Sequence, residues 1–168
     1  DGEMSFQDYF IRNKYKPKVK NILFKSKKSV ATDAVKRSLM DKNLDGIIFC
    51  PSNPFLSIDP ILSIDTIRKL IEDQKKPRIA ISPIIGNDSV KGPTSKLMKE
   101  MGVEVSSLSI AKHYKRLIDG IVIDYEDEKE AEEIRKMGIE VKLSKIIVET
   151  EEEKMRLAKE SLDFIEEI

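Results

Sequence analysis

Three polar side chains follow an uninterrupted apolar run in the first half of the chain. The run extends from Ile47 to Cys50, and the loop after it contains Ser52, Asn53 and Ser57. Pro54 restricts the backbone of this loop. A run without alternation is typical of a strand covered on both faces of a parallel sheet. Ligands of doubly wound sheets bind where such strands end, and hydroxyl and amide groups donate hydrogen bonds. The loop is therefore the first candidate for a binding site.

A second loop combines backbone freedom with a positive charge. It begins at Ser82 and runs to residue 93, which is long for a connection that usually takes about 2 to 6 residues. Gly86 and Gly92 tolerate positive φ, and Lys91 adds a mobile cation. The helix predicted after the loop offers free amides that favour anions. These features are typical of a phosphate site, and an ordinary surface loop is the alternative if the segment is considered alone.

Other candidate residues are weaker. His113 falls in a predicted helix, where an unpaired histidine is more often structural than catalytic. Cys50 has no cysteine partner and no metal-ligand spacing, so we expect a small buried side chain. Asp124 at a strand end is a single carboxylate, a thin basis for a metal site. Neither a GxGxxG nor a GxxxxGK[ST] pattern is present, so a complete conventional nucleotide-binding half is missing.

Short apolar runs alternate with periodic segments, and these elements must position the two loops. We expect strands at 19–24, 45–50, 78–82, 103–105, 120–124 and 139–143, and helices at 5–15, 32–42, 66–74, 94–101, 109–117, 127–137 and from 150 onward. Such alternation predicts an α/β fold with a doubly wound, mostly parallel, Rossmann-like sheet, in one domain over residues 1–168. If the sheet is parallel, both loops leave it at the same edge.

Composition narrows the function classes. The 168 residues are 40% hydrophobic, enough for one domain with a core, and the 30 basic residues equal the 30 acidic ones. Without a long basic block, we expect neither nucleic acid nor a membrane as the main partner. A single cysteine and no apolar stretch of about 20 residues favour a cytoplasmic protein. The chain does not begin with methionine, and we expect a piece of a longer protein.

Four segments together resemble one family. They read GEMSFQDYFIR at 2–12, CPSNPFLSIDPIL at 50–62, ISPIIGNDSVKGPTSKLMKEMGVEVS at 81–106 and AKHYKRLIDGIVID at 111–124. This ordered set is similar to the 2-phospho-L-lactate transferase (CofD-type) family, over residues 2 to about 143. The resemblance implies that the chain is the C-terminal portion of such an enzyme, so that its Rossmann-like fold is incomplete at the N-terminus. It also implies that residues 1–16 form a helix from an inserted helical subdomain.

The resemblance further implies an activity in coenzyme F-420 biosynthesis. Enzymes of this family transfer a phospholactyl or phosphoenolpyruvyl group from a guanosine diphosphate ester to the deazaflavin Fo, release GMP and use Mg2+. On this basis we expect a cytoplasmic homodimer. The residues expected to bind substrate are Ser52, Asn53, Pro54, Ser57, Ser82, Gly86, Lys91 and Gly92. Ser52 and Asn53 would donate hydrogen bonds to the diphosphate, with Ser57 at the start of the following helix. We expect the general base in the missing N-terminal segment.

Two positions depart from the family pattern. The family usually carries a glycine pair where Gly86 and Asn87 stand, and often a glycine at Asp59. Asn tolerates the left-handed conformation, whereas Asp59 adds negative charge near a phosphate site.

Two other functions are alternatives. One is a related regulatory protein of the same fold that binds a uridine nucleotide sugar without turnover. The other is a non-catalytic interaction domain whose partner face is an N-terminal helix with Phe6, Tyr9, Phe10 and Ile11.

Overall fold

The computed structural model describes residues 2–25, 29–90 and 92–168. Its centre is a parallel sheet of four strands in the order β1-β2-β5-β6, joined by crossovers that contain helices. These strands are β1 (Ile47–Phe49), β2 (Arg78–Ile81), β5 (Gly120–Ile123) and β6 (Glu140–Leu143). In register, Ile48 lies opposite Ile79, and Ala80 opposite Ile121. The prediction of an α/β, Rossmann-like fold with a parallel sheet is confirmed.

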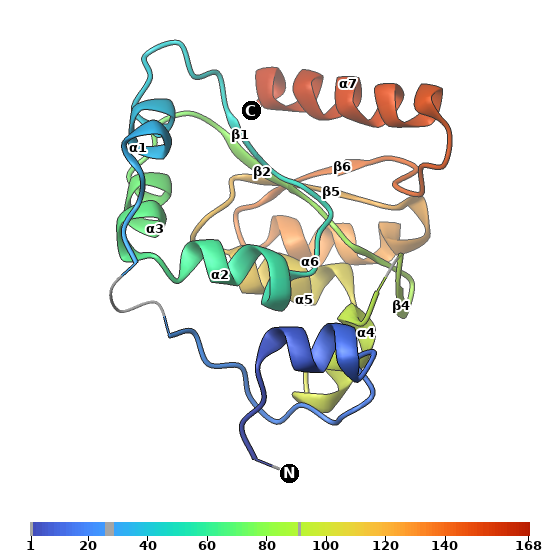
Figure 1. The fold of residues 1–168 in the computed structure, drawn as a ribbon. Helices are drawn as coiled ribbons and strands as arrows, with labels where there is room; N and C mark the ends of the chain where they lie inside the picture. Colours follow the sequence, from blue (N-terminus) through green and yellow to red (C-terminus); the bar gives the residue numbers. More distant parts are fainter. Residues whose placement is uncertain (1, 26–28, 91) are drawn as a thin grey trace.

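Helices cover both faces of the sheet (Figure 1). The helical elements are η1 (Asp8–Arg12), α1 (Asp33–Leu39), η2 (Pro54–Ile58), α2 (Asp59–Leu62), α3 (Asp65–Glu72), α4 (Thr94–Glu100), α5 (Ser107–Tyr114), η3 (Tyr125–Glu130), α6 (Ala131–Arg135) and α7 (Glu151–Glu167). α7 lies on one face, and α2, α5 and α6 lie on the other, while η1 and α4 are further from the sheet (Figure 1). Among the described residues, no helix combines the length and the hydropathy that a membrane crossing requires.

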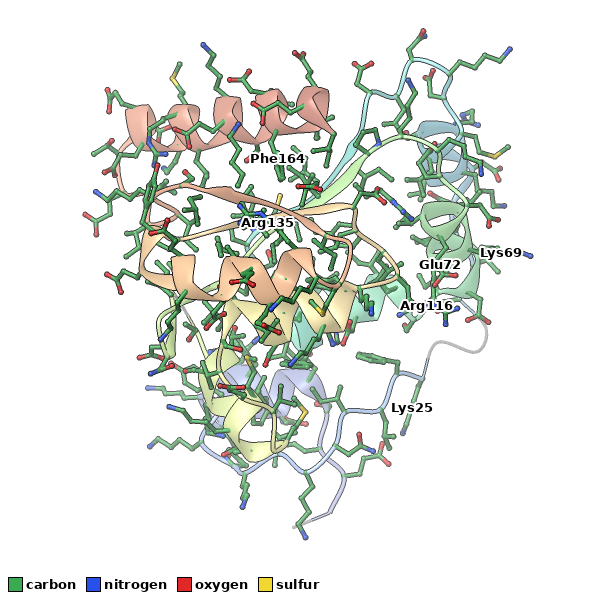
Figure 2. The ribbon with its side chains drawn as sticks, turned by 180° about the vertical axis from the view of Figure 1, so that it is seen from behind. Lys25, Lys69, Glu72, Arg116, Arg135 and Phe164 are labelled. Atoms are coloured by element: carbon green, nitrogen blue, oxygen red, sulfur yellow. The ribbon has the colours of Figure 1, made fainter. Side chains whose placement is uncertain are left out.

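Alternating strand side chains divide the core between the two faces of the sheet. Ala80 and Ile121 point into the larger cluster, under α5 and α6, whereas Ile79 and Val122 belong to the cluster beneath α7. Phe164 of α7 lies between this helix and the sheet (Figure 2). The uninterrupted apolar runs at β2 and β5 are explained by this arrangement, because each strand is covered on both faces.

Glycine allows α7 to approach the sheet closely. A Cβ atom added at Gly120 would lie 2.8 Å from Cε1 of Phe164 and 2.9 Å from Cδ1 of Ile168. Gly46 meets Ile165 in the same way, at 2.7 Å from Cγ2. Since real Cβ atoms do not come so close to other heavy atoms, these two positions fix how α7 rests on the sheet.

Two predicted strands are absent from the described chain. Residues 19–24 are mostly exposed and run past α4, where the amide of Val19 donates to Oε2 of Glu100 at 2.9 Å. Residues 103–105 instead form a short connection, in which the amide of Val103 donates to the carbonyl of Met98 and Val105 enters the core. In both segments apolar residues serve contacts other than a sheet ladder, so the strand predictions were wrong.

The helix predictions were mostly confirmed, with shifted ends. Thr32 caps α1, and Thr150 and Glu153 form a capping box at the start of α7. The predicted helix 5–15 is shorter, because the helical turns span 6–12 and the next residues turn away. Asp127 does not cap a helix: Asp124 caps η3, and Asp127 is buried.

The N-terminal apolar face differs from the expected one. Tyr9 is buried, and Lys96 of α4 lies 5.8 Å from the centre of its ring. Phe6 and Phe10 stack with ring centres 5.4 Å apart and are exposed together with Ile11. Tyr9 therefore belongs to the contact between η1 and α4 and not to an open face. The assignment of residues 1–16 to an inserted subdomain stays a prediction.

Candidate functional site

Both candidate loops leave the sheet at the same edge. β1 and β2 are adjacent and parallel, and their carboxyl ends lie at Phe49 and Ile81 (Figure 1). The loop after β1 leads into η2 and α2, and the loop after β2 leads into α4. The arrangement confirms the predicted juxtaposition, which depended only on a parallel sheet.

Asn53 is the best-placed side chain of the first loop. Its Oδ1 accepts hydrogen bonds from the amides of Phe55 and Leu56, each at 3.0 Å, and so caps η2. The Nδ2 atom of Asn53 is buried and has no hydrogen-bond partner among the described residues. A buried donor without a partner costs about 1–3 kcal/mol. It is therefore a candidate to bind a ligand acceptor such as a phosphate oxygen.

The other candidate residues of the first loop are close to Asn53 in sequence. Pro54 is buried and occupies the first position of η2, where its missing amide hydrogen costs nothing. Ser52 is half-buried, and its amide donates to the carbonyl of Cys50 at 2.6 Å. Ser57 is exposed and lies within η2, not at its start, because the helical turn already begins at Pro54. Their substrate contacts stay predictions.

The second loop contains a small hairpin that the sequence did not predict. Its strands are β3 (Ile84–Ile85) and β4 (Asp88–Ser89), and the turn begins with Gly86 at φ +57°. Gly92 has φ +71° with open space around it, as expected for a position that needs glycine. Asn87 does not have a positive φ. The predicted cation Lys91 lies outside the described residues.

A carboxylate also belongs to this loop. Asp88 accepts a hydrogen bond from the hydroxyl of Ser95 at 2.7 Å, and this bond holds the pKa of the Asp88 carboxyl below its usual value. Ser89 donates to the carbonyl of Gly92 at 3.2 Å. These bonds tie β4 to Gly92 and to Ser95 at the start of α4.

Ser82 lies beneath the second loop and not on its surface. The side chain is fully buried, and its Oγ is 2.8 Å from Oγ of Ser107 and accepts from the amide of Ile84 at 3.1 Å. The hydroxyl of Ser82 is thus occupied inside the protein. The predicted direct contact with substrate is not supported by this placement, because no surface of Ser82 is open to a ligand.

Two buried carboxylates lie at the same edge: Asp124, which was considered above only as a thin basis for a metal site, and Asp127, which the sequence did not single out as a site residue. Asp127 accepts hydrogen bonds from the amide of Gly86 and from Oγ of Ser107, both at 2.8 Å. Burial raises the pKa of Asp127 despite these bonds. Asp124 accepts from the amides of Glu126 at 3.2 Å and Ile146 at 3.0 Å, so both its oxygens are occupied by the backbone. Nothing in the acidic run 126–133 distinguished Asp127 from its solvated neighbours.

His113 and Asp59 form a pair beside the first loop. Nε2 of His113 lies 2.9 Å from Oδ1 of Asp59, and its ring lies 5.4 Å from that of Phe55 in η2. The carboxylate of Asp59, which departs from the family pattern, therefore contacts His113 of α5. Two open pockets of about 280 and 260 Å³ adjoin His113, and the lining of the first combines Phe55, Met98, Val103 and Ile110 with Ser109 and Lys112. His113 itself has a structural partner, as expected.

Two further expectations concerned Cys50 and a metal site. Cys50 is exposed at the end of β1, and the prediction of a buried side chain was wrong, because β1 is an edge strand. Within the described ranges, no group of three or more histidine, cysteine or acidic side chains has the geometry of a metal site. The described residues therefore do not supply a complete ligand set for Mg2+, and no chemical step is assigned to a metal.

Comparison with known proteins shows which family the chain resembles. The family model described as 2-phospho-L-lactate transferase CofD matches residues 1–164. Proteins named 2-phospho-L-lactate transferase are similar to the chain: that of Methanocaldococcus jannaschii is 37% identical over 161 residues, covering 96% of this chain and 50% of its own length. Those of Methanosarcina mazei and Methanopyrus kandleri are 33% and 32% identical, covering 94% and 100% of this chain and 51% and 53% of their own lengths.

The match is extensive for this chain and partial for its relatives. The chain spans about half the length of the curated relatives it matches. The matched residues include both loops at the carboxyl edge of the sheet and all four strands. On this evidence the chain belongs to the 2-phospho-L-lactate transferase family.

Proposed function

We propose that this chain supplies the diphosphate-binding edge of a 2-phospho-L-lactate transferase. In this proposal the enzyme transfers a phospholactyl or phosphoenolpyruvyl group from a guanosine diphosphate ester to the terminal hydroxyl of the deazaflavin Fo and releases GMP, in coenzyme F-420 biosynthesis. The observation that carries it is the unpartnered Nδ2 of Asn53, buried at the edge of the sheet where ligands of such folds bind. Membership of the family supports the reaction class.

The proposed chemistry is a displacement at phosphorus. The acceptor oxygen attacks the phosphorus that carries the three-carbon acid, the bond from that phosphorus to GMP breaks, and a general base takes the hydroxyl proton. Such transfers depend mainly on in-line positioning and on neutralising charge at the phosphate oxygens. Asn53 Nδ2 would donate to one of these oxygens. The absence of a side chain at Gly86 and Gly92 would let the backbone approach the diphosphate.

The general base and the magnesium ligands are proposed to come from outside the described residues. The hydroxyls of Ser52 and Ser57 are proposed as further donors, since one is half-buried and the other exposed on the same loop. Mg2+ and a homodimer in the cytoplasm remain part of the proposal.

A transfer assay on the full reading frame tests the function. The frame that includes this chain is supplied with Fo, lactyl-diphosphoguanosine and Mg2+, and the phospholactylated product is detected by mass. Omission of Mg2+ and replacement of the donor by a uridine nucleotide sugar are the controls, and sedimentation measures the oligomeric state. A folded protein that forms no product and prefers the uridine ligand would overturn the proposal in favour of a nucleotide-sugar-binding regulator.

A further inference from the structure

A buried hydrogen-bond network joins the second loop to the elements below it. Asp127 of η3, Ser107 of α5 and Ser82 at the end of β2 are each fully buried. Oδ2 of Asp127 accepts a hydrogen bond from Oγ of Ser107 at 2.8 Å. The same Oγ of Ser107 lies 2.8 Å from Oγ of Ser82. Ser82 in turn accepts from the amide of Ile84 in β3. The network therefore reaches the hairpin that forms the loop.

The other oxygen of Asp127 contacts the loop directly. Oδ1 accepts the amide hydrogen of Gly86 at 2.8 Å, at the turn between β3 and β4. Gly86 has φ +57°, and a Cβ placed there would meet only Oε2 of Glu126, at 3.7 Å. The outer side of Gly86 is thus open, while its amide is held from within.

The charge of Asp127 makes this network costly. Among the residues that the structure describes, no basic side chain forms an ion pair with Asp127 at 4.0 Å or less. A buried carboxylate without a cation is unfavourable unless its hydrogen bonds are complete. Its two 2.8 Å bonds provide this compensation, and one of them serves to hold the turn at Gly86.

We propose that Asp127 is a positioning residue, which sets the conformation of the hairpin formed by β3 and β4 through the amide of Gly86. This inference rests on the proposed function, in which the loop that contains this hairpin approaches the donor diphosphate. Asp127 does not touch the substrate. Its carboxylate determines where the loop backbone lies before the nucleotide binds, so that the loop is already ordered for the diphosphate.

Substitutions at Asp127 distinguish positioning from simple stabilisation. Asp127→Ala leaves the amide of Gly86 and the hydroxyl of Ser107 without their acceptor. Asp127→Asn preserves an oxygen for Gly86, and its amide can donate to the Ser107 hydroxyl, so it is the conservative rescue variant. Asp119→Ala is the matched control, because Asp119 also accepts from a distant backbone amide, that of Arg78 at 2.9 Å, and from a side chain.

Two measurements on the whole chain decide the proposal. GDP affinity is measured by calorimetry with Mg2+ present, and amide hydrogen exchange over residues 83–90 is measured without ligand. We expect Asp127→Ala to weaken GDP binding at least tenfold and to accelerate exchange at Gly86. We expect Asp127→Asn to stay within about threefold of the wild type, and Asp119→Ala to change neither quantity, although it lowers stability.

The outcomes separate this proposal from the proposed function. If the wild-type chain does not bind GDP, the proposed function fails for this chain, and the exchange measurement still decides whether Asp127 holds the loop. Unchanged exchange at Gly86 in Asp127→Ala would overturn the positioning role. An equal loss of GDP affinity in Asp127→Ala and Asp119→Ala would also overturn it, because the effect would then be general destabilisation.

Discussion

Replacement of Asn53 by serine separates its two roles. In the structure, Oδ1 of Asn53 caps η2 and Nδ2 has no partner among the described residues. Serine at this position retains an oxygen that accepts from the amides of Phe55 and Leu56, since serine is as good an N-cap as asparagine. It lacks the amide nitrogen. Asn53→Ala removes both the cap and the donor, and serves as the comparison.

The two variants should differ in the free energy of unfolding but not in affinity for the diphosphate. Both variants remove the unpartnered Nδ2, so the difference between them isolates the N-cap: Asn53→Ala should have a free energy of unfolding about 0.5–2 kcal/mol below that of Asn53→Ser. A hydrogen bond to a charged group contributes about 1.5–3 kcal/mol, and each 1.4 kcal/mol corresponds to a tenfold change in affinity. Both variants should therefore bind the donor diphosphate more weakly by a factor of about 10 to 100.

Urea unfolding and calorimetric titration with GDP measure the two properties on the same samples. We expect Asn53→Ala to be less stable than Asn53→Ser, and GDP affinity to fall in both variants. If Asn53→Ser binds GDP as tightly as the wild type, Nδ2 does not contact the ligand. If Asn53→Ser is as unstable as Asn53→Ala, the cap assignment is wrong.

Three further predictions follow from the packing and the charges. Gly120→Ala should destabilise the fold by about 1–3 kcal/mol in urea unfolding, because its Cβ would overlap Phe164, and Phe164→Leu in the same chain should recover part of this loss. Asp119→Ala should lower the free energy of unfolding by about 1–2 kcal/mol, because the two hydrogen bonds of 2.9 and 2.7 Å from Arg78 are lost at a half-exposed position. Thermal unfolding measures this loss, and GDP affinity should not change. Asp127→Asn should raise the unfolding temperature at pH 7. Because burial raises the pKa of Asp127, the wild type loses stability as the pH rises from the ordinary aspartate pKa through the folded one, so the advantage of the variant should disappear when unfolding is measured in acid.

The sheet could be predicted from sequence, and the small hairpin could not. Ile79 to Ile81 of β2 and Ile121 to Ile123 of β5 are apolar without alternation, which is the pattern of a strand buried on both faces. The two-residue strands β3 and β4 are too short to show any periodicity. The segment 19–24 shows the opposite failure, since its apolar residues lie on the surface without a neighbouring strand.

The candidate site was predictable in place but not in its internal contacts. The loops were located because parallel strands end at a common edge. Ser82 follows β2 directly and was expected to face a ligand, yet the structure turns it inward to Ser107, which is 25 residues away. Asp127 lies in an acidic run typical of a solvated helix, and only the tertiary contact with Gly86 reveals its burial. Side-chain direction at strand ends depends on such long-range contacts.

The position of Cys50 has a practical consequence for study of the site. It is the only cysteine of the chain, and it is exposed where β1 ends, two residues before Ser52 and three before Asn53. A thiol-reactive fluorophore therefore attaches at one defined position without removal of any other cysteine. Its emission would report optically, and in real time, on events at the edge of the sheet where the donor is proposed to bind.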